Sequence, residues 1–246
     1  MVFMSRIKRG LIYAPGSKWW EITLEFADKY ASRIAPSFFI RRFRKLYGYS
    51  GVWQRTYWLG VIAMKCPLDF WVYQEIIWET RPKFIIETGT RNGGSALYFA
   101  SICDLIGEGR VITVDVDDIA LRTLSHPRVT AIVGDSVSDD VINQVRQLVG
   151  HQTAMVSLDS DHSKDHVLRE MELYSEFVPP GNYLVVEDTG LRGPGPGKAV
   201  HEFLRHRKDF VPDRSREKFL HTGFRGGFLK RIRDQQSATS EGEKIE

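Results

Sequence analysis

The acidic residues of this sequence are the ones whose placement most clearly predicts chemistry. Short apolar runs typical of buried strands recur from residue 83 onward, and acids stand at the ends of five of them. Parallel strands of one sheet end at the same edge, where ligands bind, so these acids should gather there. Carboxylates crowded in this way repel one another unless a cation or a ligand offsets their charge. The acids concerned are Glu87, Asp115, Asp135, Asp159, Glu187 and Asp188.

Two of these strand ends carry residues that we predict to bind a metal ion. Asp159 follows the apolar run 154–158, and Glu187 and Asp188 follow the run 183–186. Carboxylates from two adjacent strand ends can converge on one cation, and Mg²⁺ prefers such oxygen ligands. Mg²⁺ also keeps water molecules that a substrate hydroxyl can replace, and the pKa of a metal-bound hydroxyl is lowered.

A histidine close to Asp159 completes the predicted catalytic pair. His162 is a natural general base beside a metal-bound hydroxyl, although a loop histidine with a structural hydrogen bond is the simpler alternative. Asp159 and His162 are the predicted catalytic residues, and Asp161 could be a further metal ligand. His162 and His166 have a spacing that can bind zinc, but neither a cysteine nor a glutamate between them supports a zinc site.

A glycine-rich segment indicates a cofactor site after the first strand. The sequence ETGTRNGGS, residues 87–95, overlaps the end of the apolar run 83–87. Glycines let the backbone approach a ligand closely, and the start of the next helix offers unpaired N–H groups. The pattern is neither the dinucleotide GxGxxG nor a phosphate-binding loop. Taken alone, a tight strand-to-helix turn explains it equally well.

Acids about 20 residues further along strengthen the prediction of a cofactor. Asp115 ends the run 110–115, and Asp117 lies two residues later. Nucleotide-binding α/β domains place an acid near this position to bind a ribose. Either residue could do so, and a helix cap or a loop acid is the alternative. Combined with the glycine-rich segment, ribose binding is the better interpretation.

A segment of alternating glycine and proline, GPGPG at 193–197, follows the predicted metal site. Its composition predicts neither a helix nor a central strand. It could form one wall of a substrate pocket, or it could equally be a passive linker.

Strands and helices must alternate along the chain to position these residues. Apolar runs without a polar face indicate strands covered on both sides, which is typical of a parallel, doubly wound α/β sheet of the Rossmann-like kind. We expect a terminal antiparallel hairpin within 218–231, with Gly226 and Gly227 at its turn. The predicted strands are 83–87, 110–115, 129–133, 154–158 and 183–186, and the predicted helices are 70–80, 95–105, 139–149 and 166–177.

Three regions follow from this pattern. Residues 1–80 are predicted to form a helical, aromatic-rich extension, 81–234 the main domain and 235–246 a disordered polar tail. Residues 1–60 contain 11 Lys and Arg against 3 Asp and Glu, a net charge of +8, which leaves −5 elsewhere because the whole chain is +3. This basic arm could attract phosphates, a membrane surface or another subunit, but a solvated helix face is favoured.

Composition excludes several classes of protein. The two cysteines, Cys66 and Cys103, lie in no metal-binding pattern and cannot form a disulfide framework, which fits a reducing compartment. No apolar run is long enough for a signal peptide or a membrane span, so we expect a cytoplasmic protein. The basic arm lacks any nucleic-acid-binding module, and we expect it to serve oligomer contacts or pocket closure. Membrane contact by the arm is the less favoured alternative.

The motifs together resemble those of the cephalosporin hydroxylase family, which is similar to rhamnosyl and other sugar O-methyltransferases. The resemblance rests on four segments in order, IIETGTRNGGSALYFA, LDSDHSKDHVLRE, GNYLVVEDT and GPGPGKAVHEFL. It covers roughly residues 50–231. It implies a class I methyltransferase fold, S-adenosylmethionine, Mg²⁺, a small-molecule acceptor such as a sugar hydroxyl in natural-product or glycolipid biosynthesis, and a homo-oligomer.

The resemblance also implies roles for particular residues. The methionine end of the cofactor would lie along the first motif, at Glu87, Gly89, Thr90 and Ser95, and an acid of VDVDD, Asp115 or Asp117, would hold the ribose. The adenine would lie near Gly134, Asp135 and Ser136. The implied metal ligands are Asp159, Glu187 and Asp188.

One departure from the family pattern concerns the acceptor. Sugar-methylating members carry an Asn-x-x-Gly-His-Pro run before GPGP, whereas here only residues 190–192 separate the EDT triplet from it. A shorter loop is expected to reshape the acceptor pocket. Two alternatives stay open at this point, a hydroxylase or oxygenase component and a non-catalytic cofactor-binding subunit, although no flavin motif, haem ligand or clear iron triad supports an oxygenase.

Overall fold

The structure, a computed structural model, describes residues 36–119, 122, 124–190, 195–219 and 221–232. The chain divides into two compact units, Met1–Ser50 and Gly51–Glu246. In the first unit the described part is the helix α3, Pro36–Ser50, whose described sequence contains four basic residues and no acidic one. The predicted tail at 235–246 and the rest of the predicted basic arm up to residue 35 lie outside the described residues.

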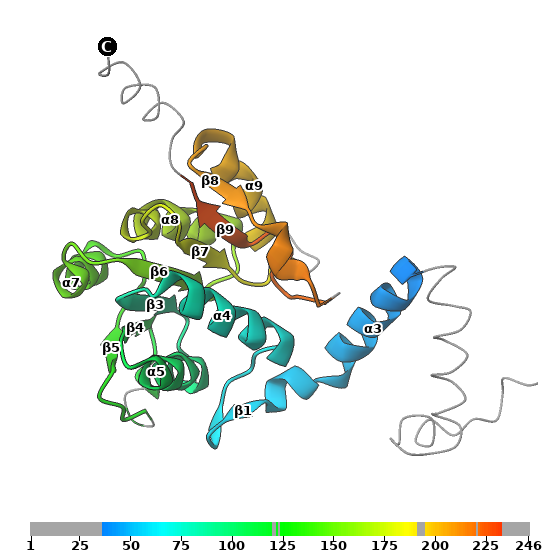
Figure 1. Cartoon of the computed structure of the whole chain (residues 1–246), viewed down its shortest axis with the longest axis horizontal. Helices are drawn as coiled ribbons and strands as arrows, with labels where there is room; N and C mark the ends of the chain where they lie inside the picture. Colours follow the sequence, from blue (N-terminus) through cyan, green and yellow to red (C-terminus); the bar gives the residue numbers. More distant parts are fainter. Residues whose placement is uncertain (1–35, 120–121, 123, 191–194, 220, 233–246) are drawn as a thin grey trace, which may run out of the picture. The chain divides into compact units, whose positions relative to one another are not determined.

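The second unit is built on a seven-stranded sheet with the order β5-β4-β3-β6-β7-β9-β8 (Figure 1). The five strands from β5 to β7 are parallel, and β9 pairs antiparallel with both β7 and β8. This sheet confirms the predicted α/β fold. The strands are β3 Phe84–Thr88, β4 Arg110–Asp115, β5 Val129–Val133, β6 Ala154–Leu158, β7 Tyr183–Val186, β8 Phe210–Pro212 and β9 Phe228–Arg231.

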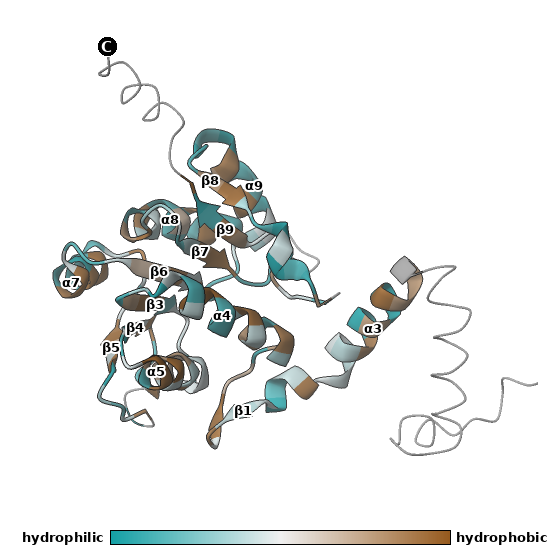
Figure 2. Cartoon of the chain, in the orientation of Figure 1, coloured by the Kyte–Doolittle hydropathy of each residue, from teal (hydrophilic) through white to brown (hydrophobic). Residues whose placement is uncertain are grey.

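Helices cover both faces of the sheet, and each face has its own apolar core. Neighbouring residues of β3 point to opposite sides, Ile85 toward α4 and α5, and Ile86 toward α7, α8 and α9. Apolar residues accordingly dominate the central strands (Figure 2). The helices are α4 Pro67–Thr80, α5 Gly94–Ile106, α7 Asp139–Val149, α8 Lys164–Tyr174 and α9 Pro196–His206, with short 3₁₀ turns η2 Val52–Arg55, η3 Ser175–Phe177 and η4 Arg214–Glu217.

Two predicted elements differ from the observed ones at the C-terminal end. The antiparallel partners of 228–231 are β7 and β8, so the strand added beyond β9 is 210–212 and not part of 218–227 as predicted. Gly226 does lie in a turn, with φ +78°. This turn stands at the end of the long connection from β8 and leads directly into β9. The exclusion of helix from the whole GPGPG segment was also wrong, because α9 begins at Pro196. Proline fits the first turn of a helix, where its missing N–H has no partner to lose.

The region before β3 belongs to the same compact unit as the sheet. It contains a small antiparallel pair, β1 Tyr57–Trp58 and β2 Val61–Ile62, and the helix α4. Tyr73 and Ile76 of α4 are fully buried in the sheet's core. The structure therefore divides after Ser50, whereas the sequence pattern predicts a boundary at residue 80. Within the described part of the chain, no helix combines the length and the apolar composition that a membrane crossing requires.

Candidate active site

The candidate site lies at the carboxyl edge of three adjacent strands, β3, β6 and β7. In the register of the sheet Thr88 pairs with Leu158, and Leu158 pairs with Val186, so these strands end at the same level. The ladder continues one residue further, because the backbone N–H of Asp159 donates to the Thr88 carbonyl at 3.1 Å and that of Glu187 to the Leu158 carbonyl at 3.0 Å. The residues that follow the strands therefore meet at one edge, as the sequence predicts.

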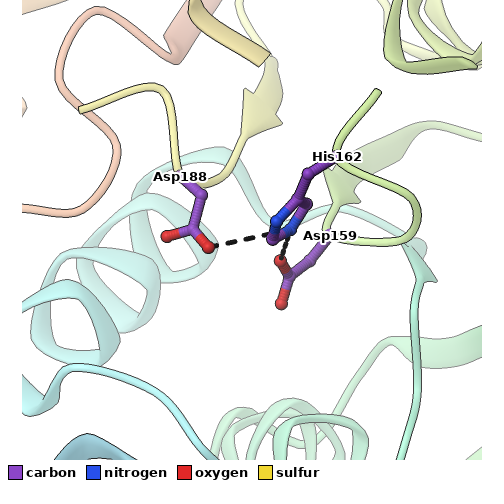
Figure 3. Close-up of side chains that lie close together, drawn as sticks. All are labelled: Asp159, His162 and Asp188. Carbon is purple, nitrogen blue, oxygen red and sulfur yellow. Dashed lines mark hydrogen bonds and ion pairs between the residues drawn. The ribbon is translucent and has the colours of Figure 1, made fainter. Parts of the chain in front are cut away.

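Three side chains at this edge form a group that could hold a metal ion (Figure 3). The Nε2 atom of His162 lies 3.2 Å from Oδ1 of Asp159 and 3.7 Å from Oδ2 of Asp188. One potential ligand atom from each residue lies within 4.8 Å of the other two. The His162 side chain is 46% exposed, so a ligand can reach it. The structure thus brings the predicted catalytic pair together with one of the two acids after β7.

The charges of this group depend on one another. The hydrogen bond to Asp159 raises the pKa of His162 above its ordinary value. Burial opposes ionisation of Asp159, but Lys65 and His162 outweigh it and lower the pKa of that carboxyl. Burial, together with the nearby Asp159 carboxylate, raises the pKa of Asp188. A cation near Asp159 and Asp188 would relieve this unfavourable proximity.

The other acid after β7, Glu187, points into the protein. Its carboxylate accepts hydrogen bonds from Lys65 Nζ at 2.6 Å, Tyr73 Oη at 2.8 Å and Ser157 Oγ at 2.9 Å. Burial raises the pKa of Glu187, and the Lys65 ammonium opposes that shift. Asp188, by contrast, has φ +56°, a left-handed conformation that aspartate tolerates better than most residues. The predicted metal role of Glu187 stays a prediction, because its carboxylate is not part of the group in Figure 3.

Lys65 is the residue of this site that sequence reasoning missed. Its ammonium group binds Asp159 Oδ2 as well as Glu187, and the side chain is only 5% exposed. Burial alone would lower the pKa of Lys65, but Asp159 and Glu187 together raise it above its usual value. A signal did exist in the sequence, since Lys65 is the single charged residue between Arg55 and Asp69, in a largely apolar stretch. Charged residues are rarely buried unless they are paired.

The glycine-rich turn is packed directly against the backbone of Asp159. Gly89 has φ +84°, and a Cβ atom at this position would lie 2.0 Å from the carbonyl oxygen of Asp159. Only glycine allows this approach. Glu87, predicted at the cofactor, is fully buried beneath the turn and accepts a hydrogen bond from Thr113 Oγ1 at 2.7 Å. Thr113 in turn lies 2.5 Å from Thr90 Oγ1, and Ser95 is also buried.

The structure separates the two candidate ribose acids. Asp115 lies against the glycine-rich turn, because its Oδ2 accepts a hydrogen bond from the backbone N–H of Arg91 at 2.7 Å. Both acids also form local turns, because Asp115 accepts from the N–H of Asp117 at 3.0 Å and Asp117 from that of Ile119 at 2.9 Å, but only Asp115 of the two is bonded to the glycine-rich turn. Gly134 is next to Asp115, since its N–H donates to the Asp115 carbonyl at 2.8 Å. Asp115 is therefore the better placed of the two for a nucleoside.

Ser136 and His166 belong to a buried polar network behind this edge. Ser136 Oγ and Ser160 Oγ both donate to Oε1 of Glu170, at 2.6 and 2.7 Å, and Glu170 is fully buried. His166 Nε2 lies 3.1 Å from Ser136 Oγ. Ser136 therefore faces the interior, while its neighbour Asp135 is exposed. His166 lies in this network and not in the group of His162, which removes the basis for a zinc pair.

Two further predicted features have local roles. Asp161 Oδ1 accepts a hydrogen bond from the N–H of Ser163 at 2.6 Å, just before α8, and is not part of the group in Figure 3 that could hold a metal ion. Of the GPGPG segment, 193–194 lie outside the described residues. A Cβ atom on Gly195 would lie 1.9 Å from the carbonyl oxygen of His162, so the start of α9 packs on the loop that carries the candidate base.

Comparisons with known proteins extend over most of the chain. The family model Rhamnosyl O-methyltransferase/CmcI matches residues 50–232. A rhamnosyl O-methyltransferase of Mycobacterium tuberculosis (strain ATCC 25618 / H37Rv) is 38% identical over 204 residues, which cover 77% of this chain and 83% of the relative. One from Mycobacterium leprae (strain TN) is 36% identical over 203 residues, covering 77% and 89%.

The fold has counterparts among solved structures. The structure "cmcI-D160 Mg-SAM" matches with a TM-score of 0.60 at 22% identity, over 73% of this chain and 78% of that one. The structure "CmcI-N160 apo-structure" matches with a TM-score of 0.59 at 22% identity, over 74% and 78%. At this level of identity the likeness concerns the fold.

Proposed function

Because the chain belongs to the Rhamnosyl O-methyltransferase/CmcI family, we propose that it transfers the methyl group of S-adenosylmethionine to a hydroxyl of a sugar or a similar natural-product acceptor, with Mg²⁺ at the carboxylate edge. The observation that carries this proposal is a juxtaposition. The glycine-rich turn at Gly89 touches the backbone of Asp159, whose side chain stands beside His162 and Asp188. A cofactor on the turn and a metal on the carboxylates would therefore be neighbours.

The donor set of the group fits a divalent ion. Asp159 and Asp188 offer carboxylate oxygens, the ligands that Mg²⁺ prefers, and the ring of His162 stands beside them. The carboxylates of Asp159 and Asp188 would hold the ion, with His162 at its side. When bound, such an ion lowers the pKa of a substrate hydroxyl and stabilises the negative charge that develops on its oxygen.

Proton removal falls to His162. Asp159 accepts the hydrogen bond of Nε2 and so orients the imidazole ring at the edge of the site. The partly exposed ring can meet an acceptor hydroxyl and would take its proton. S-adenosylmethionine would supply the methyl group to the acceptor oxygen and, as the bond between its sulfonium sulfur and that carbon breaks, leave as S-adenosylhomocysteine. The raised pKa of His162 also lets it hold that proton after transfer.

The cofactor side is assigned to the turn and to β4. Gly89 and Gly93 both have positive φ and place no side chain at the start of α5. The carboxylate at the amino-acid end of the cofactor can therefore approach the backbone N–H groups there. Asp115 beside Arg91 is proposed to hold the ribose. The structure "cmcI-D160 Mg-SAM", which shares this fold, supports S-adenosylmethionine and Mg²⁺ as the groups bound.

A sugar hydroxyl is the proposed acceptor because the relatives that cover most of this chain are rhamnosyl O-methyltransferases. The loop after Thr189 is short in this sequence, which bears on the shape of the acceptor pocket. A homo-oligomer and a contact or closure role for residues 1–60 remain predictions, as does a cytoplasmic location.

The test is a methyl-transfer assay on the full chain. Purified protein is incubated with S-adenosylmethionine, Mg²⁺ and rhamnosyl acceptors, and mass spectrometry follows the gain of one methyl group. Isothermal titration with S-adenosylmethionine, with and without Mg²⁺, separates cofactor binding from turnover. We expect cofactor binding, an acceptor-dependent product and loss of turnover in EDTA. Binding without a product for any sugar acceptor would favour a non-catalytic subunit, and full turnover in EDTA would remove the metal from the mechanism.

A further inference from the structure

We propose that the Lys65 ammonium is a built-in counter-ion of the carboxylate edge, formed by Asp159, Glu187 and Asp188. The ammonium shares Asp159 with a divalent ion and thereby limits how tightly the edge binds that ion. The inference rests on the proposed function in one respect, the binding of a divalent ion at this edge. It does not depend on methyl transfer.

The first observation is that Lys65 and the group of Figure 3 divide Asp159 between them. Oδ2 of Asp159 binds the Lys65 ammonium, while Oδ1 faces His162. The same ammonium lies 2.6 Å from Oε2 of Glu187. An ion that bridged Asp159 and Glu187, as the sequence motifs imply, would have to approach the place where Lys65 Nζ lies. The lysine therefore competes for Asp159 with an ion held by Asp159 and Asp188, and it occupies the place from which an ion would reach Glu187.

The second observation is that the structure holds Lys65 firmly in this place. Thr56 Oγ1 lies 3.1 Å from both the backbone nitrogen and the carbonyl oxygen of Lys65. Pro67 begins α4 two residues later. From the same helix Tyr73 reaches Glu187 as well. One segment, 65–73, thus delivers both a cation and a hydroxyl to the acid that follows β7.

The third observation is the balance of buried charge. Four carboxylates are buried among the described residues, Asp69, Glu87, Glu170 and Glu187, whereas Lys65 is the one lysine or arginine that is buried there. Unpaired buried charges are strongly unfavourable, and breaking one partner of a buried pair is costly. Removing Lys65 would leave Asp159 and Glu187 in need of another cation. A divalent ion is the nearest replacement, and it would bind without the repulsion of a lysine beside it.

The experiment measures binding of Mn²⁺, which can replace Mg²⁺ and is visible by electron paramagnetic resonance. Full-length wild type and Lys65→Met are titrated with Mn²⁺ and melted in EDTA and in excess Mn²⁺. We expect Lys65→Met to bind Mn²⁺ at least about tenfold more tightly than wild type, since each tenfold corresponds to about 1.4 kcal/mol. We also expect its melting temperature to depend on Mn²⁺ more than that of wild type. Equal or weaker binding of Mn²⁺ would overturn the proposal.

Three further variants sharpen the result. Lys65→Arg keeps the charge and should leave Mn²⁺ affinity within about threefold of wild type. Lys83→Met removes a half-exposed lysine that pairs with Glu108 away from the site, and should change nothing in Mn²⁺ binding. The double variant Lys65→Met/Glu187→Gln also neutralises the more deeply buried of the two carboxylates that Lys65 pairs with, leaving only Asp159 charged, and in EDTA it should melt above Lys65→Met.

The double variant also decides the case in which Lys65→Met does not fold. If Lys65→Met folds only with Mn²⁺, or if the double variant folds where the single one does not, the counter-ion role is supported. If neither variant folds under any condition, the proposal is wrong, because the loss of folding then does not come from an unpaired buried charge. If the Lys65 variants show these effects on Mn²⁺ binding and the wild type nevertheless methylates no acceptor, the proposed function is contradicted and the role of Lys65 stands.

Discussion

The two halves of the candidate site are built by different physical means. On the cofactor side, around β3 and β4, backbone conformation sets the shape, because Gly89 allows a close approach of two chain segments and Asp115 binds backbone N–H groups. On the metal side, around β6 and β7, charge sets the shape, because Lys65, Asp159 and Glu187 form a buried ion-paired cluster. Substitutions should therefore act through steric conflict on one side and through electrostatics on the other.

The largest effect is expected from Gly89→Val. A side chain there would collide with the backbone of Asp159, at a φ of +84° that β-branched residues rarely adopt. We expect S-adenosylmethionine binding to be lost and the free energy of unfolding to fall by about 4 kcal/mol. Calorimetric titration and denaturant unfolding measure the two effects. The matched control is Gly107→Ala, which has φ +86° but open space around it, and should cost about 1–2 kcal/mol without changing cofactor affinity.

The next largest effect tests the metal side through charge. Asp159→Asn keeps the shape of the side chain but removes a negative charge that both His162 and Lys65 contact. We expect kcat to fall about 100-fold or more, while the affinity for S-adenosylmethionine stays within about threefold. Steady-state kinetics and titration calorimetry separate the two quantities. Asp161→Asn is the neighbouring control, and equal losses in both variants would show that charge at this loop, and not Asp159 itself, matters.

The candidate base should show itself in the pH dependence. A general base must be neutral to accept a proton, and the hydrogen bond to Asp159 raises the pKa of His162 above its ordinary value near 6.5. In wild type kcat/KM should therefore fall as pH drops through that raised pKa. His162→Ala should lose about 100-fold near neutral pH and recover part of the loss at higher pH, where less help from a base is needed. The exposed His151→Ala serves as the control, and a His162→Ala profile parallel to that of wild type would assign the base elsewhere.

The smallest effect distinguishes the two acids near the cofactor. Asp115→Ala should weaken S-adenosylmethionine binding about tenfold, because it removes both a candidate ribose ligand and the acceptor that holds the turn at Arg91. Asp117→Ala should change affinity by less than about threefold, because that side chain caps a local turn. Calorimetry on the two variants gives the comparison directly. A larger loss for Asp117 than for Asp115 would reverse the assignment.

Much of this architecture could be predicted from the sequence. The apolar runs define the five parallel strands, and parallel pairing brings their ends to one edge, so the convergence of Asp159 with the acids after β7 follows from local pattern alone. Two elements near the C-terminal end were less predictable. β9 pairs with β7 and with β8, a short strand that ends about 15 residues before it, and α9 begins inside a segment whose composition argues against helix.

Side-chain direction within the site was decided only by the tertiary structure. Two consecutive acids, Glu187 and Asp188, are equivalent in the sequence pattern, yet one faces the buried core and the other the edge. Glu187 is bound there by Tyr73, Ser157 and above all Lys65, which is 122 residues before it and arrives on a separate segment of the chain. Local periodicity carries no information about such a contact, because its energy comes from pairing charges that only the folded chain brings together and removes from water.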